Sequence, residues 1–394
     1  MKYFFVLGNN PTLSIAEITT VFSGQSIIVN DQILILDSLE NIQPSQVITR
    51  LGGTIKLGVI NSQVDRKNYK KILKNILQLI EKKEIVGKFK FGISCYGVDT
   101  INEKKLGLTI KKNLQDKGIS CRWVVSNEAT LSSVVVEQNK LIDKGMEIIL
   151  IKINNKILIG QTLAVQPFKQ LSFRDYGRPA RDDLSGMLPP KLAQIMLNLA
   201  KIKPNYTILD PFCGSGTILT EAMLINSQNV IGADISSKAI KDTKKNIEWI
   251  TTNYKLPIIN YQLFNVDVTQ ILKHVQANSI DAIVTEPYLG PQRGKIKIEQ
   301  VVKELNNLYS QTLIEFDKIL KSTGRIVIVW PVFCSHQELR HLNPILNNFK
   351  IINPILKNLQ QDKRIKLTER NTIIYGREQQ KIWREIVILE KFTY

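Results

Sequence analysis

Residues that bind metals are scarce in this chain of 394 residues. It has four cysteines and three histidines, the cysteines lie far apart, and no Cys-x-x-Cys pair occurs. These absences exclude the common zinc motifs and the disulfide framework of a small secreted domain. We expect reduced thiols, a cytoplasmic protein and no metal cofactor.

Long apolar runs are also absent. No hydrophobic stretch approaches the ~18 residues that a membrane-spanning helix needs. The apolar opening, residues 1–7, is short for the core of a signal peptide, and it meets Asn9, Asn10 and Pro11 at once. We interpret it as a first β-strand, and we expect no membrane partner.

Acidic residues are in the minority. The sequence has 53 Lys and Arg against 35 Asp and Glu, for a formal net charge of +18. This balance favours polyanionic partners, nucleic acid first, although an AT-rich genome would also produce a chain rich in Lys, Ile and Asn. Residues 63–125 alone hold 15 Lys and Arg against 6 Asp and Glu. Lysines on predicted helices there could bind RNA phosphates or form an ordinary solvated face; they include Lys104, Lys105, Lys111 and Lys112.

The first half of the chain alternates strand and helix patterns without a regular βαβ repeat. A helix is expected over 14–22, with Ser14 as its N-cap and Glu17 at capping-box spacing. The turn Asn30-Asp31 predicts a hairpin. The polar, turn-rich residues 166–185 are expected to form a linker or a functional loop. Other helices are expected over 67–83 and 104–117, and strands over 89–96, 121–126, 147–153 and 156–162.

The second half changes to a regular alternation of strands and helices. Such an alternation predicts a parallel sheet with right-handed crossovers. Two late segments, 370–375 and 382–392, are expected to pair antiparallel at one edge. The chain is therefore predicted to be α/β, with a Rossmann-like carboxyl half. The expected parallel strands cover 206–210, 229–235, 261–266, 280–285 and 325–330.

A glycine turn stands between the first of these strands and the following helix. Gly214 and Gly216 remove Cβ atoms where a ligand must approach the backbone, and the helix start supplies free N–H groups and a positive dipole end. This suits an anionic group such as the carboxylate of S-adenosylmethionine, with a plain turn as the alternative. The turn lacks the Gly-Lys-Ser/Thr of a phosphate-binding loop and the glycine pattern of a dinucleotide site. The expected donor-binding residues are Asp210, Pro211, Phe212, Cys213, Gly214, Ser215, Gly216 and Thr217, with Cys213 in a packing role.

Two further acids follow at strand ends. Asp234 precedes Ile235, about 20 residues after the glycine turn, where an acid commonly binds a ribose hydroxyl; it could instead cap the next helix. Asp267, beside Val268, could accept a hydrogen bond from an adenine amino group or serve as a turn residue. Together with Asp210, these acids lie where open parallel sheets bind ligands. The pattern predicts S-adenosylmethionine as cofactor.

The segment Thr285-Glu286-Pro287-Tyr288 follows another predicted strand. It resembles the Asp/Asn/Ser-Pro-Pro-Tyr motif of methyltransferases that modify exocyclic amino groups of bases. In that motif a side-chain oxygen and a backbone carbonyl accept hydrogen bonds from the amine, and the aromatic ring stacks on the base. Pro287 and Tyr288 match, whereas Thr285 replaces Asp, Asn or Ser and Glu286 replaces the first proline. We expect Thr285 or Glu286 to accept from the amine and Tyr288 to stack.

Five segments spread over nearly the whole chain are similar to a single family: 5–17, 50–56, 91–97, 174–193 and 375–385. Residues 174–182 with 186–193 are the most family-specific. The family is that of the tRNA (guanine-10-N2)-methyltransferases with a THUMP RNA-binding domain. The resemblance implies S-adenosylmethionine as donor and N2 of a tRNA guanosine, at position 10, as acceptor.

The same resemblance implies a domain order. A ferredoxin-like part is expected over 1–62, an α+β THUMP RNA-binding domain over 63–165, a linker over 166–185 and a Rossmann-like class I methyltransferase domain over 186–394. tRNA is the expected partner. The sequence identifies no protein partner and is compatible with a monomer.

Three arginines near the linker allow two interpretations. Arg174, Arg178 and Arg181 could guide RNA into the site, or they could brace the linker. The acids available for such bracing are Asp175, Asp182 and Asp183.

Two other functions stay open. One is methylation of an amino group on a DNA or ribosomal RNA base. The other is tRNA binding without catalysis, because Thr285 and Glu286 depart from the amine-directed motif.

Overall fold

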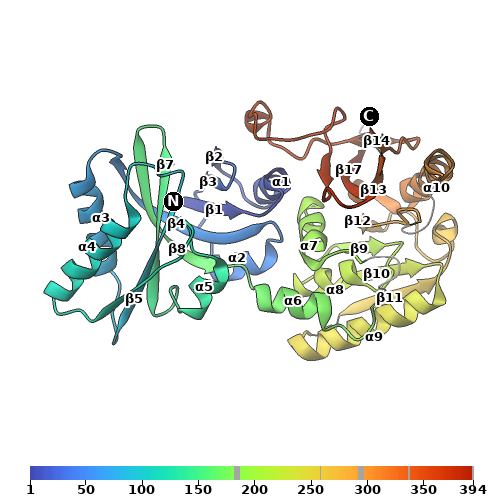
Figure 1. Cartoon of the computed structure of the whole chain (residues 1–394). Coiled ribbons are helices and arrows are strands. Elements are labelled where there is room, and N and C mark those ends of the chain that lie inside the picture. The colour runs from blue at the N-terminus through green and yellow to red at the C-terminus, as the bar shows by residue number, and fades with distance from the viewer. Residues whose placement is uncertain (182–186, 258, 292–296, 336–337, 393–394) are drawn as a thin grey trace. The chain divides into compact units, whose positions relative to one another are not determined.

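The computed structural model describes residues 1–394 except 182–186, 258, 292–296, 336–337 and 393–394. The chain forms two compact units (Figure 1). Unit 1 comprises Met1–Ile15 and Phe22–Pro167, and unit 2 comprises Ala16–Val21 and Phe168–Tyr394. Each unit is built on a β-sheet of its own.

Unit 1 contains an eight-stranded mixed sheet. Its strands are β1 Lys2–Leu7, β2 Gln25–Asn30, β3 Ile33–Asp37, β4 Thr54–Asp65, β5 Phe89–Tyr96, β6 Cys121–Val124, β7 Gly145–Ile153 and β8 Lys156–Val165. They lie in the order β2-β3-β1-β4-β8-β7-β5-β6, antiparallel as far as β7 and parallel from β7 to β6. The helices are α2 Pro44–Arg50, α3 Tyr69–Glu81, α4 Glu103–Asp116 and α5 Ser133–Gln138, together with the start of α1 Pro11–Val21, whose residues Ala16–Val21 belong to unit 2. The expected hairpin is confirmed as β2–β3, and the expected helices and strands are found with shifted ends.

The boundary expected between residues 62 and 63 is wrong. It falls inside β4, which pairs with β1 on one side and with β8 from Lys56 to Asp65 on the other. Because this strand joins both parts through backbone hydrogen bonds, residues 1–165 share one sheet and no domain border divides them there.

The start of α1 also differs from expectation. The helix begins at Pro11, and the side chain of Asn10 accepts a hydrogen bond from the Leu13 N–H at 3.0 Å. Ser14 lies inside the helix, where its hydroxyl donates to the Gly53 carbonyl at 2.7 Å. Ser14 is therefore not the N-cap, and the proline at the first helical position is a better marker of the start.

A buried ion pair ties the strands of unit 1 together. The Lys56 ammonium donates to the Glu147 carboxylate and to the Leu131 carbonyl, both at 2.5 Å. The hydroxyls of Ser94 and Thr162 also donate to Glu147, each at 2.6 Å. Both charged side chains are almost fully buried, at 2% and 0% exposed. Every charge is thus paired, the condition under which buried ions are tolerated.

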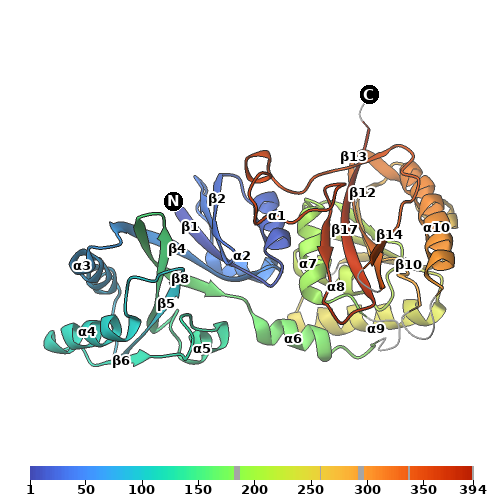
Figure 2. The same ribbon diagram turned by 45° about the horizontal axis from the view of Figure 1, so that its top comes forward.

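Unit 2 contains a nine-stranded sheet with helices on both faces (Figure 2). Its strands are β9 Thr207–Asp210, β10 Asn229–Asp234, β11 Asn260–Asn265, β12 Ile280–Thr285, β13 Leu320–Ser335, β14 Glu338–His341, β15 Phe349–Ile351, β16 Ile373–Tyr375 and β17 Ile382–Lys391. Its α-helices are α6 Phe168–Tyr176, α7 Pro190–Leu199, α8 Thr217–Leu224, α9 Ser237–Tyr254 and α10 Ile298–Ile319, and its 3₁₀ helices are η1 Val268–Lys273 and η2 Lys357–Leu359. Along one face α7 packs on α8 and α8 on α9, whereas α10 lies on the other face with η1.

The strand order places a binding crevice near the middle of this sheet. The order is β11-β10-β9-β12-β13-β17-β15, with β11 to β13 parallel and β17 antiparallel. The direction of chain progression reverses between β9 and β12, and open parallel sheets bind ligands at the carboxyl ends of strands beside such a reversal. The prediction of a parallel sheet is confirmed. The late antiparallel pair is confirmed as β16–β17, but β17 lies inside the sheet rather than at its edge.

The linker expected over 166–185 is structured where it is described. Phe168–Tyr176 forms α6, which belongs to unit 2 and buries Leu171 and Arg174. Residues 182–185 lie outside the described part of the chain. Unit 2 therefore begins near Phe168, well before the expected border at residue 186.

The buried pair gives a first prediction. Glu147→Ala should lower the free energy of unfolding by about 3–5 kcal/mol, because the Lys56 ammonium stays buried without its partner. Urea unfolding followed by circular dichroism would measure this loss. Glu81→Ala is the matched control: it breaks the half-exposed Glu81–Lys117 pair and should cost less than ~1 kcal/mol. Equal losses in the two variants would contradict the prediction.

Candidate active site

The glycine turn joins β9 to α8 at the carboxyl edge of the sheet. Gly214 and Gly216 adopt left-handed backbone conformations, with φ of 53° and 83°. A Cβ at Gly216 would lie 2.9 Å from a carbon of the Thr243 side chain, so a larger residue would be strained and crowded there. A Cβ at Gly214 would meet nothing within 4 Å, so a ligand can approach this side of the turn. Cys213 is buried, which raises the pKa of its thiol and agrees with a packing role.

Asp234 connects the end of β10 to the glycine turn. Its carboxylate accepts hydrogen bonds from the Gly214 N–H at 3.0 Å and from the Ser236 N–H at 2.8 Å. The N-cap of α9 is Ser236, whose hydroxyl accepts from the Ala239 N–H. The alternative in which Asp234 caps this helix is therefore wrong. Its role toward a ribose stays a prediction.

Asp267 begins the short helix η1. Its Oδ1 accepts from the Thr269 N–H at 2.8 Å and from the Thr269 hydroxyl at 2.7 Å. The local turn role is thus present. Asp267 also lines the cavity together with Val268, so its predicted contact with an adenine amino group remains compatible with the geometry.

A cavity of about 770 Å³ lies over these strand ends. This volume falls in the range of small-molecule sites. The cavity brings together Asp210, Asp234 and Asp267 from three strand ends and the acceptor segment Glu286-Pro287-Tyr288. Most residues predicted to bind the donor line it: Asp210, Pro211, Phe212, Cys213, Gly214, Ser215, Thr217, Asp234, Ile235, Asp267 and Val268.

Thr285 does not reach this cavity. Its side chain is fully buried, and its hydroxyl donates to Asp210 Oδ1 at 2.7 Å. A hydroxyl enclosed in this way cannot meet a base, so the expectation that Thr285 accepts a hydrogen bond from the amine is contradicted. Its position at the last residue of β12 instead fixes the carboxyl group at the end of β9.

Glu286 is the acidic side chain of the acceptor segment that faces the cavity. It forms a two-pronged ion pair with Arg384 of β17, in which Nη2 donates to Oε1 at 3.1 Å and Nε donates to Oε2. Tyr288 is 57% exposed at the rim, as a stacking platform requires. The Tyr309 hydroxyl donates to the Tyr288 carbonyl at 3.0 Å and so anchors this segment to α10.

The Asp210 carboxyl group is the most perturbed acid in the cavity. Burial raises its pKa to about 7, against the lowering effect of hydrogen bonds from Thr285 and the Phe212 N–H. The charges of Asp234 and Glu286 raise it further. Asp210 therefore changes its charge near neutral pH.

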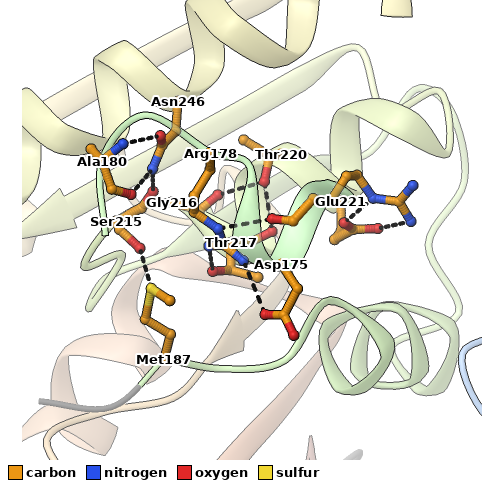
Figure 3. Close-up of polar contacts among 11 residues, drawn as sticks. Asp175, Arg178, Ala180, Met187, Ser215, Gly216, Thr217, Thr220, Glu221 and Asn246 are labelled. Atoms are coloured by element: carbon orange, nitrogen blue, oxygen red, sulfur yellow. Dashed lines mark hydrogen bonds and ion pairs between the residues drawn. The ribbon is translucent and has the colours of Figure 1, made fainter. Parts of the chain in front are cut away.

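Two of the predicted RNA-contacting arginines, Arg174 and Arg178, are buried within unit 2. Arg174 forms a two-pronged pair with Glu221 of α8, at 2.6 and 3.2 Å. Arg178 donates to the Thr217 hydroxyl at 2.6 Å and lies 3.9 Å from Asp175 (Figure 3). With exposed fractions of 5% and 7%, neither side chain is available to RNA. The RNA-guiding interpretation is wrong for both.

Arg174 and Arg178 therefore brace this segment, as the second interpretation expected. Their partners are mostly other than the acids named for that role. Of the acids named for it, Asp175 contacts Arg178, whereas Asp182 and Asp183 lie outside the described residues. Arg181 is exposed, with its guanidinium 5.5 Å from the centre of the Tyr176 ring. It remains a candidate for RNA contact.

Asn246 of α9 was not found from the sequence. Its amide donates to the Ala180 carbonyl at 2.9 Å and to the Ser215 carbonyl at 2.8 Å, and it accepts from the Ala180 N–H at 3.1 Å (Figure 3). The available signal was a polar residue on the buried stripe of an amphipathic helix, beside Thr243 and Ile247. Through this side chain, the segment after α6 holds the glycine turn.

The predicted phosphate-binding lysines lie on α4 of unit 1. Lys104, Lys105 and Lys112 are exposed and Lys111 is half-buried. The opposite stripe of α4, including Leu106 and Ile110, packs into the core of the unit. Their contact with RNA stays a prediction.

Metal and membrane signals are both missing from the described residues. No group of three or more His, Cys, Asp or Glu there could hold a metal ion. Among the described helices, none has the length and apolar composition needed to cross a bilayer.

Two family models match the chain. The one described as "RMKL-like, methyltransferase domain" matches residues 178–342, and one described as "DNA methylase" matches residues 63–245. The solved structure of TrmN from Thermus thermophilus has a TM-score of 0.54 and 16% identity, with all of both chains covered. At this identity the likeness shows the fold alone. The family models and the fold together indicate a methyltransferase with a mixed α/β fold.

Curated relatives narrow this class. A probable tRNA (guanine(10)-N2)-dimethyltransferase of Methanothermococcus thermolithotrophicus is 32% identical over 30% of this chain and 72% of its own length. The tRNA (guanine(10)-N2)-dimethyltransferase of Pyrococcus abyssi is 24% identical over 84% of this chain and 88% of its own length. Two other archaeal relatives of that name are matched over 60% and 48% of their length. The chain belongs to the tRNA (guanine-N2)-methyltransferase family.

The raised pKa of Asp210 gives a second prediction. Its pKa in the folded protein, about 7, lies above the ordinary value of 3.8. Between these two pH values, the folded protein keeps a proton that the unfolded chain has lost. This group should therefore lower the free energy of unfolding of the ligand-free protein as the pH rises from about 4 to about 7, by up to ~1.4 kcal/mol per pH unit.

Asp210→Asn should remove this part of the pH dependence. Urea unfolding of the wild type and the variant across that pH window would compare the two slopes. Parallel curves would show that the Asp210 pKa is not raised.

Proposed function

We propose that this chain transfers a methyl group from S-adenosylmethionine to the N2 amine of a tRNA guanosine, at position 10 as the relatives' names indicate. The observation that carries the proposal is the shared cavity: the glycine turn with its strand-end acids and Glu286-Pro287-Tyr288 line one space. A donor and an acceptor amine held in that space would be adjacent, and proximity of this kind provides much of a transfer enzyme's rate enhancement.

The donor side of the cavity has groups that fit each part of S-adenosylmethionine. The glycine turn and the start of α8 offer N–H groups to the carboxylate. Asp234 can accept from ribose hydroxyls and Asp267 from the adenine amine, while Ile235, 72% exposed, offers an apolar surface to the adenine ring. When bound, the donor would supply a methyl group on positively charged sulfur. As the N2 lone pair forms the new N–C bond, the S–C bond would break, S-adenosylhomocysteine would leave, and the N2 proton would pass to the Glu286 carboxylate.

On the acceptor side, the Glu286 carboxylate accepts a hydrogen bond from the amine and so directs the nitrogen lone pair toward the methyl group. The exposed Tyr288 ring stacks on the guanine, which must be out of its helical stack to enter the cavity. Pro287 keeps the segment between them rigid.

Unit 1 is the RNA-binding part in this proposal. Its eight-stranded sheet combines the expected ferredoxin-like and THUMP parts, and the α4 lysines Lys104, Lys105, Lys111 and Lys112 bind tRNA phosphates, with Arg181 of unit 2 as a further contact. The enzyme acts in the cytoplasm as a monomer, which the four free cysteines support for the compartment.

The third prediction concerns the product. Incubation with unmodified tRNA transcript and methyl-labelled donor, followed by digestion to nucleosides, should place the label in N2-methylguanosine. A Tyr288→Ala variant should bind S-adenosylhomocysteine normally in calorimetry while losing ~10-fold or more in transfer, since base stacking contributes about 1–3 kcal/mol.

The same assay separates the other functions. Label in another nucleoside, or transfer to DNA or ribosomal RNA instead of tRNA, would overturn the substrate. Normal donor and tRNA binding without transfer would indicate a tRNA-binding protein without catalysis.

The fourth prediction concerns the α4 lysines. Lys104→Gln and Lys112→Gln together should weaken tRNA binding similarly for all tRNA sequences, and should lower the slope of log affinity against log salt by about 1–2, as expected when two phosphate contacts are lost. Filter binding at several salt concentrations would measure both. The control is Lys2→Gln with Lys156→Gln, at exposed lysines elsewhere on unit 1; equal effects in the two pairs would argue against a specific α4 surface.

A further inference from the structure

The Glu286 carboxylate is held by an arginine that comes from a distant part of the sequence. Arg384 donates two hydrogen bonds to it, one to each carboxylate oxygen. Both side chains are largely buried in the cavity wall, at 14% and 13% exposed. A two-pronged guanidinium–carboxylate pair fixes the plane of the carboxylate as well as its position.

The sheet determines which way Arg384 points. It lies near the start of β17, opposite Pro331 of β13, and β13 separates β17 from β12. Its side chain therefore crosses one strand to reach Glu286, the residue that follows β12. The next residue, Glu385, points to the other face, where it pairs with Arg370. Because side chains alternate along a strand, a shift of one residue would remove the arginine from the cavity.

Titratable groups on three other elements interact with the Glu286–Arg384 pair. Asp210 of β9 and Tyr309 of α10 both interact electrostatically with Glu286, and Tyr375 of β16 interacts with Arg384. Burial lowers the pKa of Arg384, but the charge and hydrogen bonds of Glu286, together with Tyr375, outweigh this effect and raise it. The arginine is therefore a permanent positive charge.

We propose that Arg384 is a positioning residue for methyl transfer: it fixes the position and plane of the Glu286 carboxylate toward the base, and so makes the cavity selective for guanine. This inference rests on the proposed function. A carboxylate has about four lone-pair sites, and Arg384 occupies the site on each oxygen that faces it. The remaining sites point away from each other, so the base meets the free site of one oxygen.

Guanine matches this acceptor better than the other bases do. It presents N1–H and N2–H donors side by side, and both can donate to that carboxylate oxygen. Adenine presents an N6–H donor beside the N1 lone pair, which a carboxylate repels. The Glu286–Arg384 pair thus gives a physical reason for the selection of guanine. The proline that stands in place of Glu286 in the related motif has no side-chain acceptor and would not do so.

The test compares kcat and KM on unmodified tRNA for the wild type, Arg384→Met and Arg384→Lys. Arg384→Met should lower kcat by ~100-fold, within the range of catalytic polar groups. Its KM for tRNA should stay close to the wild-type value, because the carboxylate is misplaced while the surfaces that bind tRNA are unchanged. Arg384→Lys keeps the positive charge without the two-pronged fork and should restore only part of kcat.

A double-variant comparison assigns the effect to the pair. Glu286→Gln should lower kcat, and adding Arg384→Met to it should cost less than ~3-fold more, because residues that act as a unit are not additive. Arg340→Met, at an exposed arginine of the adjacent strand β14, should keep the wild-type kcat. Binding of S-adenosylhomocysteine by calorimetry should be unchanged throughout, which excludes unfolding as the cause.

Base selectivity provides an independent readout. 2-Aminopurine keeps the N2 amine but replaces N1–H by a lone pair, so a transcript with 2-aminopurine at the methylated position should be a poor substrate for the wild type. The discrimination should fall in Glu286→Gln, whose amide can donate to that lone pair. An unchanged kcat in Arg384→Met, or additive losses in the double variant, would overturn the role of Arg384. A wild type that does not label guanosine N2 would instead refute the proposed function.

Discussion

The donor site depends on the glycine turn, and contacts from neighbouring elements fix the conformation of this turn. Two left-handed glycines in close succession allow a ligand to approach the backbone, but they leave that segment with few side chains to pack. Polar side chains from three neighbouring elements provide the missing contacts: Asp234 of β10, Asn246 of α9 and Arg178 after α6. Arg178 donates to the Arg174 carbonyl. Arg174 in turn pairs with Glu221 of α8, the helix that begins after the turn. The donor site is thus stabilised chiefly by charged and amide groups, and less by apolar packing.

The sequence predicted the half of the molecule that has a regular period. Alternating strands and helices indicated the parallel sheet, and its strand ends then placed Asp210, Asp234 and Asp267 around one cavity. Local patterns did less well where tertiary contacts decide the outcome. Ser14 is of a residue type that often caps helices, but it lies inside α1. The polar residues of α6 suggested a loop, although they form a helix that contributes Arg174 to a buried ion pair.

The acceptor segment shows a second limit of prediction from the local sequence. Thr285 and Glu286 are adjacent in sequence and were equal candidates for binding the amine, yet one is enclosed against Asp210 and the other faces the cavity. The two side chains differ because they follow one another at the end of β12, where successive side chains point in opposite directions. Arg384 could not be found in this way, since nearly a hundred residues separate it from Glu286 and only the pairing of β13 with β17 brings them together. The same applies to Asn246, whose partners lie in two other segments.

The place of α6 has a practical consequence for dividing the molecule. A catalytic fragment cut at residue 186, where the family pattern suggests a border, would lose Arg174 and Arg178. Glu221 would then be a buried acid without its cation, and the Thr217 hydroxyl at the head of α8 would lose its donor. The fragment would keep every residue that lines the donor side of the cavity and still lack the support of its glycine turn. A catalytic fragment therefore needs at least the residues from Phe168 onward, a border set by ion pairs and hydrogen bonds rather than by the edge of the sheet.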